Sequence, residues 1–330
     1  MRITNIVTSL GAKIFAALGV ATVLAMGPVP TTRAQELKVI HIGSSTVSFS
    51  AFSTYYAAER GFFKREGFDP KMVVIKTEAA IAALNSGDLD YTTFSTSTID
   101  AALRGFPVRL LAVIVQQPVM GLVVQKEITK IADLRGKKVG VSSFGGLTYD
   151  AAVEVFKHHG LDPQKDVTLL AAGGNSSRIA ALKTKALDGA FVSAPFDIRA
   201  SRQGFKVLLE SGTIFKFPYG GFSATVAKIR EKPAEVEKAV RAVMLATKAV
   251  VAPKNKDDVI RYIMGSFKLN REDSLEFYER LVPALNPTGV VPRNVIQRAI
   301  DSAVEKGVTD RPLEPDQIVD FSFVKKLKLE

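Results

Sequence analysis

Residues 83–95 (ALNSGDLDYTTFS) and residues 181–193 (ALKTKALDGAFVS) are two copies of one pattern, related by a constant offset of 98 residues. In each copy a helical stretch ends, Asp90 or Asp188 begins a strand, and the strand runs into a serine-containing loop that opens the next helix. Two βα units of any α/β protein look alike in this way. We favour a second interpretation, in which the chain contains two similar lobes that face each other.

The stretches around the two copies alternate between strand and helix patterns, because apolar runs predict strands and amphipathic spacing predicts helices. The predicted strands are 38–42, 71–75, 138–141 and 167–171, and the predicted helices between them are 55–66, 78–86, 148–159 and 177–185. From residue 230 onward the patterns are helical, at 233–251, 257–267, 271–282 and 292–306. This order predicts an α/β fold with mainly parallel sheets and right-handed crossovers.

The first 34 residues have the composition of a secretory signal peptide. Arg2 and Lys13 precede a 13-residue apolar run at 14–26, which is well short of the roughly 20 residues of a transmembrane helix. The small residues that follow predict cleavage between Ala34 and Gln35. We therefore expect the mature chain to begin at Gln35 and to reside in the periplasm.

The chain contains no cysteine, so the sequence predicts no disulfide, no redox dithiol, no zinc–thiolate site and no lipidated cysteine. The net charge is +11, and it becomes +8 without residues 1–34, which carry three basic residues and no acidic one. The remaining lysines and arginines are scattered and form no basic stripe. We therefore expect that the protein binds no nucleic acid. We also expect it to be a monomer.

The sequence shows no motif of a catalytic site. Its three histidines are His41, expected in the core of a strand, and the adjacent His158 and His159, expected to point apart on their helix. No HExxH, GxSxG or cysteine nucleophile is present. We expect no catalytic residue, no metal and no cofactor, and hence no enzyme.

A ligand site is expected beyond the carboxyl ends of the strands, where helix N-termini direct unpaired N–H groups into the crevice of an α/β sheet. Three loops rich in serine, threonine and glycine occupy such positions, at 43–50, 95–98 and 142–149. From them we expect ligand contacts by Ser44, Ser45, Thr46, Ser48, Ser95, Thr96, Ser97, Ser142, Ser143, Gly145, Gly146 and Thr148. Helix capping is the alternative role for each hydroxyl. None of the three loops contains Asp or Glu, so the expected ligand is an anion or a neutral polar molecule.

Four further residues are expected to complete the site: Asn175 and Ser193 on the rim of the second lobe, Gln117 near the hinge, and Tyr219 as a wall. Phe49, Phe144 and Phe196 are possible walls as well, with a place in the core as the alternative. Arg178 begins a predicted helix, where it either pairs with an anionic group or is solvated.

Four stretches, at 55–68, 84–95, 131–141 and 182–209, resemble the nitrate/sulfonate/taurine-type substrate-binding proteins of ABC importers. This group shares its fold with the binding proteins for thiamine pyrimidine precursors. The resemblance implies a bilobal type II periplasmic-binding-protein fold, with two α/β lobes joined by a hinge near 120–124 and 217–223. The implied lobes are 35–122 for lobe one, 123–220 for lobe two, and 221–330 for the return to lobe one with the C-terminal helices.

The resemblance also implies a function. It identifies a periplasmic solute-binding component that captures a small anionic or polar organic solute between two lobes and delivers it to the membrane permease of an ABC importer. The alternative is an enzyme of the same fold related to thiamine-pyrimidine synthesis, which needs a cysteine-rich segment and a reactive histidine. The ligand stays open among nitrate, sulfonates, pyrimidines and aromatic acids.

Overall fold

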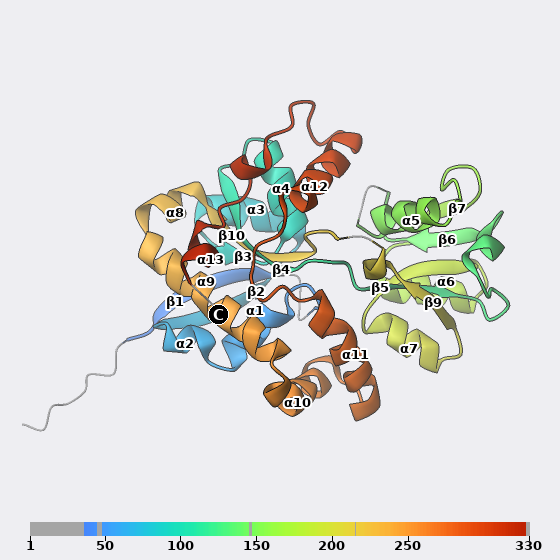
Figure 1. Cartoon of the computed structure of the whole chain (residues 1–330), viewed down its shortest axis with the longest axis horizontal. Coiled ribbons are helices and arrows are strands. Elements are labelled where there is room, and N and C mark those ends of the chain that lie inside the picture. The colour runs from blue at the N-terminus through green and yellow to red at the C-terminus, as the bar shows by residue number, and fades with distance from the viewer. Residues whose placement is uncertain (1–35, 45–47, 145–146, 215, 328–330) are drawn as a thin grey trace, which may run out of the picture. The chain divides into compact units, whose positions relative to one another are not determined.

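The computed structural model describes residues 36–44, 48–144, 147–214 and 216–327. The expected signal peptide and its cleavage site lie outside these residues, as do four expected site residues, Ser45, Thr46, Gly145 and Gly146. The described chain contains two five-stranded sheets with helices packed on them (Figure 1).

The two sheets have the same strand order. The first runs β2-β1-β3-β10-β4 and the second runs β7-β6-β8-β5-β9. The first three strands of each are parallel, and the fourth, β10 or β5, is antiparallel to both of its neighbours. The strands of the first sheet are β1 Lys38–Ser44, β2 Phe68–Val74, β3 Tyr91–Thr92, β4 Val108–Val115 and β10 Gly220–Thr225. Those of the second are β5 Met120–Val124, β6 Lys138–Val141, β7 Thr168–Ala171, β8 Gly189–Ser193 and β9 Lys206–Glu210.

The helices follow the predicted order. Those that pack on the second sheet are α5 Leu147–His158, α6 Asn175–Lys183 and α7 Phe196–Arg202 (Figure 1). The others are α1 Phe52–Glu59, α2 Phe62–Arg65, α3 Thr77–Ser86, α4 Ser95–Leu103, α8 Val226–Glu231, α9 Pro233–Val251, α10 Lys256–Phe267, α11 Arg271–Ala284, α12 Arg293–Glu305 and α13 Ser322–Lys326. We call the second sheet with α5, α6 and α7 the second lobe, and the first sheet with the remaining helices the first lobe.

For most of the predicted elements, the predicted boundaries agree well with those in the structure. The strand at 138–141 and the helix at 233–251 have their predicted bounds, and Pro233 stands in the first turn of α9, where its missing N–H costs nothing. The predicted helix at 55–66 is instead two helices. It is interrupted at Gly61, whose φ of 72° is left-handed and ends α1.

The repeated aspartates have the same structural role in both lobes. A carboxylate oxygen of Asp90 accepts a hydrogen bond from the backbone N–H of His41 in β1 at 2.8 Å. A carboxylate oxygen of Asp188 accepts one from the backbone N–H of Lys138 in β6 at 2.9 Å. Each aspartate therefore joins the strand after its helix to the central parallel strand of its own sheet.

A leucine and a glycine repeat in the same way. A Cβ atom at Gly43 would lie 2.6 Å from Cδ1 of Leu89, and one at Gly140 would lie 2.5 Å from Cδ1 of Leu187. A larger residue at either glycine would require the end of the leucine side chain to shift. Together with the common strand order, this equivalence confirms that the sequence repeat reflects two similar lobes.

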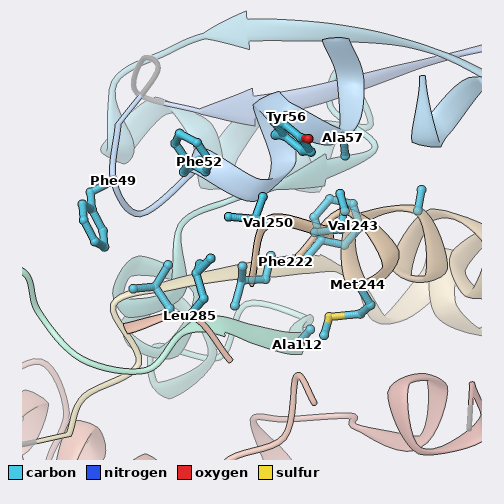
Figure 2. Close-up of a cluster of buried hydrophobic side chains, with 14 of the residues drawn as sticks. Phe49, Phe52, Tyr56, Ala57, Ala112, Phe222, Val243, Met244, Val250 and Leu285 are labelled. Atoms are coloured by element: carbon cyan, nitrogen blue, oxygen red, sulfur yellow. The ribbon is translucent and has the colours of Figure 1, made fainter. Parts of the chain in front are cut away.

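The core of the first lobe is dominated by aromatic and aliphatic side chains from α1, α9 and the sheet. Figure 2 shows Phe52 and Tyr56 from α1, Val243 and Val250 from α9, and Phe222 from β10 within this cluster. These side chains are almost fully buried. Each is worth roughly 1.5–3 kcal/mol of burial free energy, so α9 is held to the sheet by packing.

The chain crosses between the sheets at 116–119 and 211–219, where the backbone N–H groups of Phe217 and Tyr219 donate to the carbonyls of Gln116 and Val115, at 3.0 and 2.9 Å. The hinge expected near 120–124 is displaced, because β5 is buried and hydrogen-bonded on both edges as an inner strand of the second sheet. The second expected segment, 217–223, likewise runs into β10. The division of the chain at 122/123 and 220/221 stays a prediction.

Candidate functional site

A buried arginine lies at the carboxyl end of the second sheet. The side chain of Arg178, in the first turn of α6, is 2% exposed. Its Nε donates to the carbonyl of Phe191 at 2.8 Å, its Nη2 donates to Oδ1 of Asn175 at 2.7 Å, and its Nη1 donates to the carbonyl of Gly173. Arg178 therefore ties the loop before α6 to the end of β8, and its solvated alternative is wrong.

Three of the expected site residues join this arginine. Oδ1 of Asn175 also accepts from the backbone N–H of Ser193 at 3.1 Å, and Ser193 hydrogen-bonds to the hydroxyl of Tyr219 on the crossing segment. Burial raises the pKa of Tyr219, while its hydrogen bond with Ser193 opposes the rise. The structure thus brings Asn175, Ser193 and Tyr219 together around Arg178, although they are far apart in sequence.

The charge of Arg178 has no acidic partner within the described part of the chain. Burial lowers the pKa of its guanidinium to about 10, so it remains protonated at neutral pH. None of the ion pairs formed by the described residues includes it. A buried cation without a carboxylate partner is unfavourable, and an anion bound nearby would relieve this cost.

Around the ends of the two sheets, six segments connect strands to the helices that follow them. Arg178 is the single charged residue in these segments. These segments are 43–58, 91–99, 140–149, 172–178, 189–196 and 219–227. All other polar residues in them are neutral hydroxyls and amides. The sequence therefore surrounds one positive charge with short, uncharged hydrogen-bonding groups.

The loop after β6 is closed on itself. The backbone N–H of Ser142 donates to Oγ1 of Thr148 at 2.7 Å, and the two hydroxyls lie 2.7 Å apart. Thr148 is buried, whereas Ser143 and Phe144 are exposed. Within this loop the hydroxyl of Thr148 binds the residue after β6 and does not cap the helix, and Ser143 is exposed to solvent.

The carboxyl end of the first sheet contains buried hydroxyls. Ser44 ends β1, and burial raises the pKa of Tyr55 while the nearby Ser44 side chain lowers it. Ser95 opens α4, and its Oγ has no hydrogen-bond partner among the described residues; the same holds for Ser53 and Thr54 in the first turn of α1. Buried hydroxyls without partners are costly, and a polar ligand could supply the missing bonds.

Ser53, Thr54 and Tyr55 were not expected in the site. The helix predicted to begin at residue 55 begins at Phe52, so these residues stand at its N-terminus beside Ser44. The run of hydroxyls continues without interruption from the loop into the helix, and that continuity was the available signal.

The remaining expected residues lie elsewhere. Ser97 lines a separate cavity of about 350 Å³ with Asp100 and Arg104, and Thr96 is half-buried beside it on α4. The Oγ atoms of Ser48 and Ser50 lie 3.2 Å apart. The Gln117 amide oxygen accepts from the ammonium group of Lys216 across the two crossing segments. The structure does not bring these residues to Arg178.

The aromatic candidates divide between core and surface. Phe49 is 1% exposed and packs on Phe277 of α11 with ring centres 5.1 Å apart, so it is a core residue. Phe144 is 64% exposed, with its ring edge-on to Tyr149 at 5.8 Å. Phe196 is partly buried and packs against the core of the second sheet.

Two expectations about histidines are wrong. The side chain of His41 is 48% exposed, because it alternates along β1 with the buried Ile40 and Ile42 and so points to the opposite face. The rings of His158 and His159 do not point apart but touch edge to face at 5.0 Å. The described residues contain no group of three or more potential metal ligands.

Solved structures with this fold include solute-binding proteins of importers. A putative periplasmic sulfonate-binding protein SsuA from Methylobacillus flagellatus is 20% identical, with a TM-score of 0.72 over 90% of this chain and 96% of that one. The periplasmic nitrate-binding protein NrtA from Synechocystis is 17% identical, with a TM-score of 0.71 over 90% of both chains. These similarities confirm the bilobal type II periplasmic-binding fold.

A curated relative is an enzyme. The 4-amino-5-hydroxymethyl-2-methylpyrimidine phosphate synthase THI5 of Saccharomyces cerevisiae is 32% identical over 130 residues, which make up 38% of this chain. The match spans 37% of the length of the yeast protein. A family described as NMT1/THI5 like matches residues 48–255, well over half of the sequence, and the chain belongs to this family.

Proposed function

We propose that the protein is the solute-binding component of an ABC importer and that its solute is a small anionic or polar organic molecule. Arg178 carries this proposal, because it is a buried cation without a carboxylate partner among the described residues. A solute with one anionic group would compensate this charge, and the surrounding hydroxyls would bind its neutral oxygen or nitrogen atoms.

The fold supports the role in transport. The sulfonate-binding and nitrate-binding proteins that share it are periplasmic, and residues 1–34 have the composition of a signal peptide. We infer that the mature protein is periplasmic and not lipidated, that it binds solute between its lobes, and that it delivers the solute to a membrane permease. No helix of the described chain is long and apolar enough to cross a bilayer.

An enzyme of the same fold is the second candidate, and the identity with the yeast synthase favours it. The absence of cysteine and of a catalytic motif argues against it. Mass spectrometry of the solute after binding and release separates the two. An unchanged solute supports a binding protein, and a chemically altered solute supports an enzyme.

The charge argument is tested with the substitution Asn175→Asp. Oδ1 of Asn175 lies 2.7 Å from Nη2 of Arg178, so the substitution gives the arginine an internal carboxylate without changing the size of the side chain. We expect the folded protein to keep its thermal stability and anion binding to weaken at least tenfold, about 1.4 kcal/mol. The anion would now meet a neutralised arginine and a like charge.

The assay is a thermal-shift screen followed by titration calorimetry with nitrate, ethanesulfonate, benzoate, 4-aminopyrimidine and ethylamine. A ligand at 100 times its Kd stabilises by about 2.7 kcal/mol. Arg298→Met, which removes an exposed cation from α12, is the matched control and should bind as the wild type does. Stabilisation of the wild type by ethylamine alone, or unchanged anion affinity in Asn175→Asp, would refute the assignment.

A further inference from the structure

On one side of the molecule, Lys306 and Ser302 join the lobes through Asp150. The ammonium group of Lys306, at the end of α12 in the first lobe, lies 2.5 Å from Oδ2 of Asp150 in α5 of the second lobe. The hydroxyl of Ser302 donates to the same carboxylate oxygen at 3.3 Å. Helices α5 and α12 line a cavity of about 910 Å³ around this ion pair, with Tyr149 and Arg298 among its walls.

Lys306 also offsets a repulsion. Burial raises the pKa of Asp150, and burial likewise raises the pKa of Asp100 in α4 of the first lobe. The negative charge of Asp150 raises the pKa of Asp100 further, whereas Lys306 lowers the pKa of both. Lys306 therefore offsets the repulsion between two carboxylates from opposite lobes, as Arg104 also does for Asp100.

On the other side of the molecule, a buried junction joins the lobes. Nη2 of Arg280 in α11 lies 2.5 Å from Oδ2 of Asp197 in α7, and its Nε lies 2.7 Å from Glu210 in β9. The side chain of Asp197 is fully buried and that of Arg280 is 9% exposed. The backbone N–H of Gly121 in β5 also donates to Asp197, at 3.0 Å.

Further contacts strengthen this junction. Arg202 of α7 forms ion pairs with three acidic residues of α11, at 2.7 Å to Asp273, 3.0 Å to Glu272 and 3.3 Å to Glu276. Ile198 of α7 belongs to the hydrophobic core of the first lobe. The α7–α11 side thus combines a buried charge pair and further ion pairs with apolar packing. Buried residues of α5 and α12 also share one hydrophobic cluster, but the charged contact between these helices is partly exposed and borders a cavity.

We propose that the lobes part on the α5–α12 side, with Lys306–Asp150 as the latch and the Arg280–Asp197 junction as the pivot. The latch is weaker because its ion pair is partly exposed and borders a cavity, whereas separating Arg280 from Asp197 would leave a fully buried carboxylate unpaired.

The test uses distances between spin labels and needs no solute, so its outcome is independent of the proposed function. The chain has no cysteine, so two introduced cysteines are its only labelling sites. His158→Cys with Val304→Cys reports the α5–α12 side, and Gln203→Cys with Glu279→Cys reports the α7–α11 side. All four positions are exposed, and none belongs to the latch or the pivot.

Double electron–electron resonance on the Lys306→Met variant should lengthen the 158–304 distance beyond the wild-type distribution and leave the 203–279 distance unchanged. The double variant Asp150→Asn/Lys306→Met should return toward the wild-type distance, because the repulsion between Asp100 and Asp150 is removed. Arg298→Met is the matched control, a cation lost from the same helix and cavity, and should leave both distances unchanged.

Three results would overturn the proposal. The first is an unchanged 158–304 distance in Lys306→Met. The second is equal lengthening of both distances, which would mean that no pivot exists. The third is the same lengthening in Arg298→Met, which would assign the effect to the charge of the cavity wall in general.

Discussion

The substitution Arg280→Met measures the energy stored in the α7–α11 junction. It removes the cation that lies 2.5 Å from Asp197 and leaves this fully buried carboxylate unpaired. Losing one partner of a buried ion pair costs about 3–5 kcal/mol. Asp197 keeps hydrogen bonds from the backbone N–H groups of Gly121 and Ile198, so we expect the lower end, about 3 kcal/mol.

The assay is urea unfolding at pH 7, with the free energy of unfolding extrapolated to water. Arg202→Gln is the matched control, because Arg202 also joins α7 to α11 but is 45% exposed. Its loss should cost at most about 1 kcal/mol, as for a surface ion pair. The double variant Asp197→Asn/Arg280→Met should recover part of the loss, since no buried charge remains. If Arg280→Met costs no more than Arg202→Gln, the reasoning about the buried junction is wrong.

Two further predictions concern packing and pH. Gly221→Ala should lower the free energy of unfolding by about 1–3 kcal/mol, because a Cβ atom there would lie 2.5 Å from Oγ of Ser95 and 2.7 Å from the carbonyl oxygen of Ala112. The control is Gly265→Ala in α10, where no atom lies within 4 Å of the added Cβ. It should be neutral or stabilising in the same urea assay. Burial, with the hydrogen bond to Asp258, raises the pKa of Tyr56 from 10.0 to about 12, so its contribution to stability should be complete below pH 10 and lost as pH rises toward 12. Tyr56→Phe should therefore lose less stability than the wild type between pH 10 and 12, and equal losses would contradict the assignment.

The parallel strands and most of the helices could be read from the sequence because they depend on local patterns, whereas β4, β5, β9 and β10 were not predicted. The repeat at 83–95 and 181–193 predicted two similar lobes. Its aspartates are equivalent in the structure, because a carboxylate oxygen of each accepts a backbone N–H of the neighbouring parallel strand, at 2.8 Å for Asp90 and 2.9 Å for Asp188. The exposure of His41 was also readable, because Ile40 and Ile42 on either side alternate with it along the strand. The expectation that His41 lies in the core was wrong because alternate residues of a strand point to opposite faces of the sheet.

The candidate site was only partly readable. Loops after strands were the right places to examine, and Asn175, Ser193 and Tyr219 do meet. For the arginine that joins them, pairing with an anionic group and solvation were both open, because nothing local to residues 175–183 shows that β8 covers its side chain. Burial of one side chain depends on the elements packed over it, which lie far away in the chain.

The sequence by itself determined the two α/β halves, their parallel strands and most of their helices, since apolar periodicity and turn residues act over a few positions. It did not predict β4, β5, β9 or β10. Only the tertiary structure decided that β5 and β10 each enter a sheet between strands distant in sequence, and that Lys306 and Arg280 meet acidic residues 156 and 83 positions away. The physical reason is that the packing of the whole chain determines which charged residues pair and which strands lie inside a sheet. No short stretch of sequence carries that information.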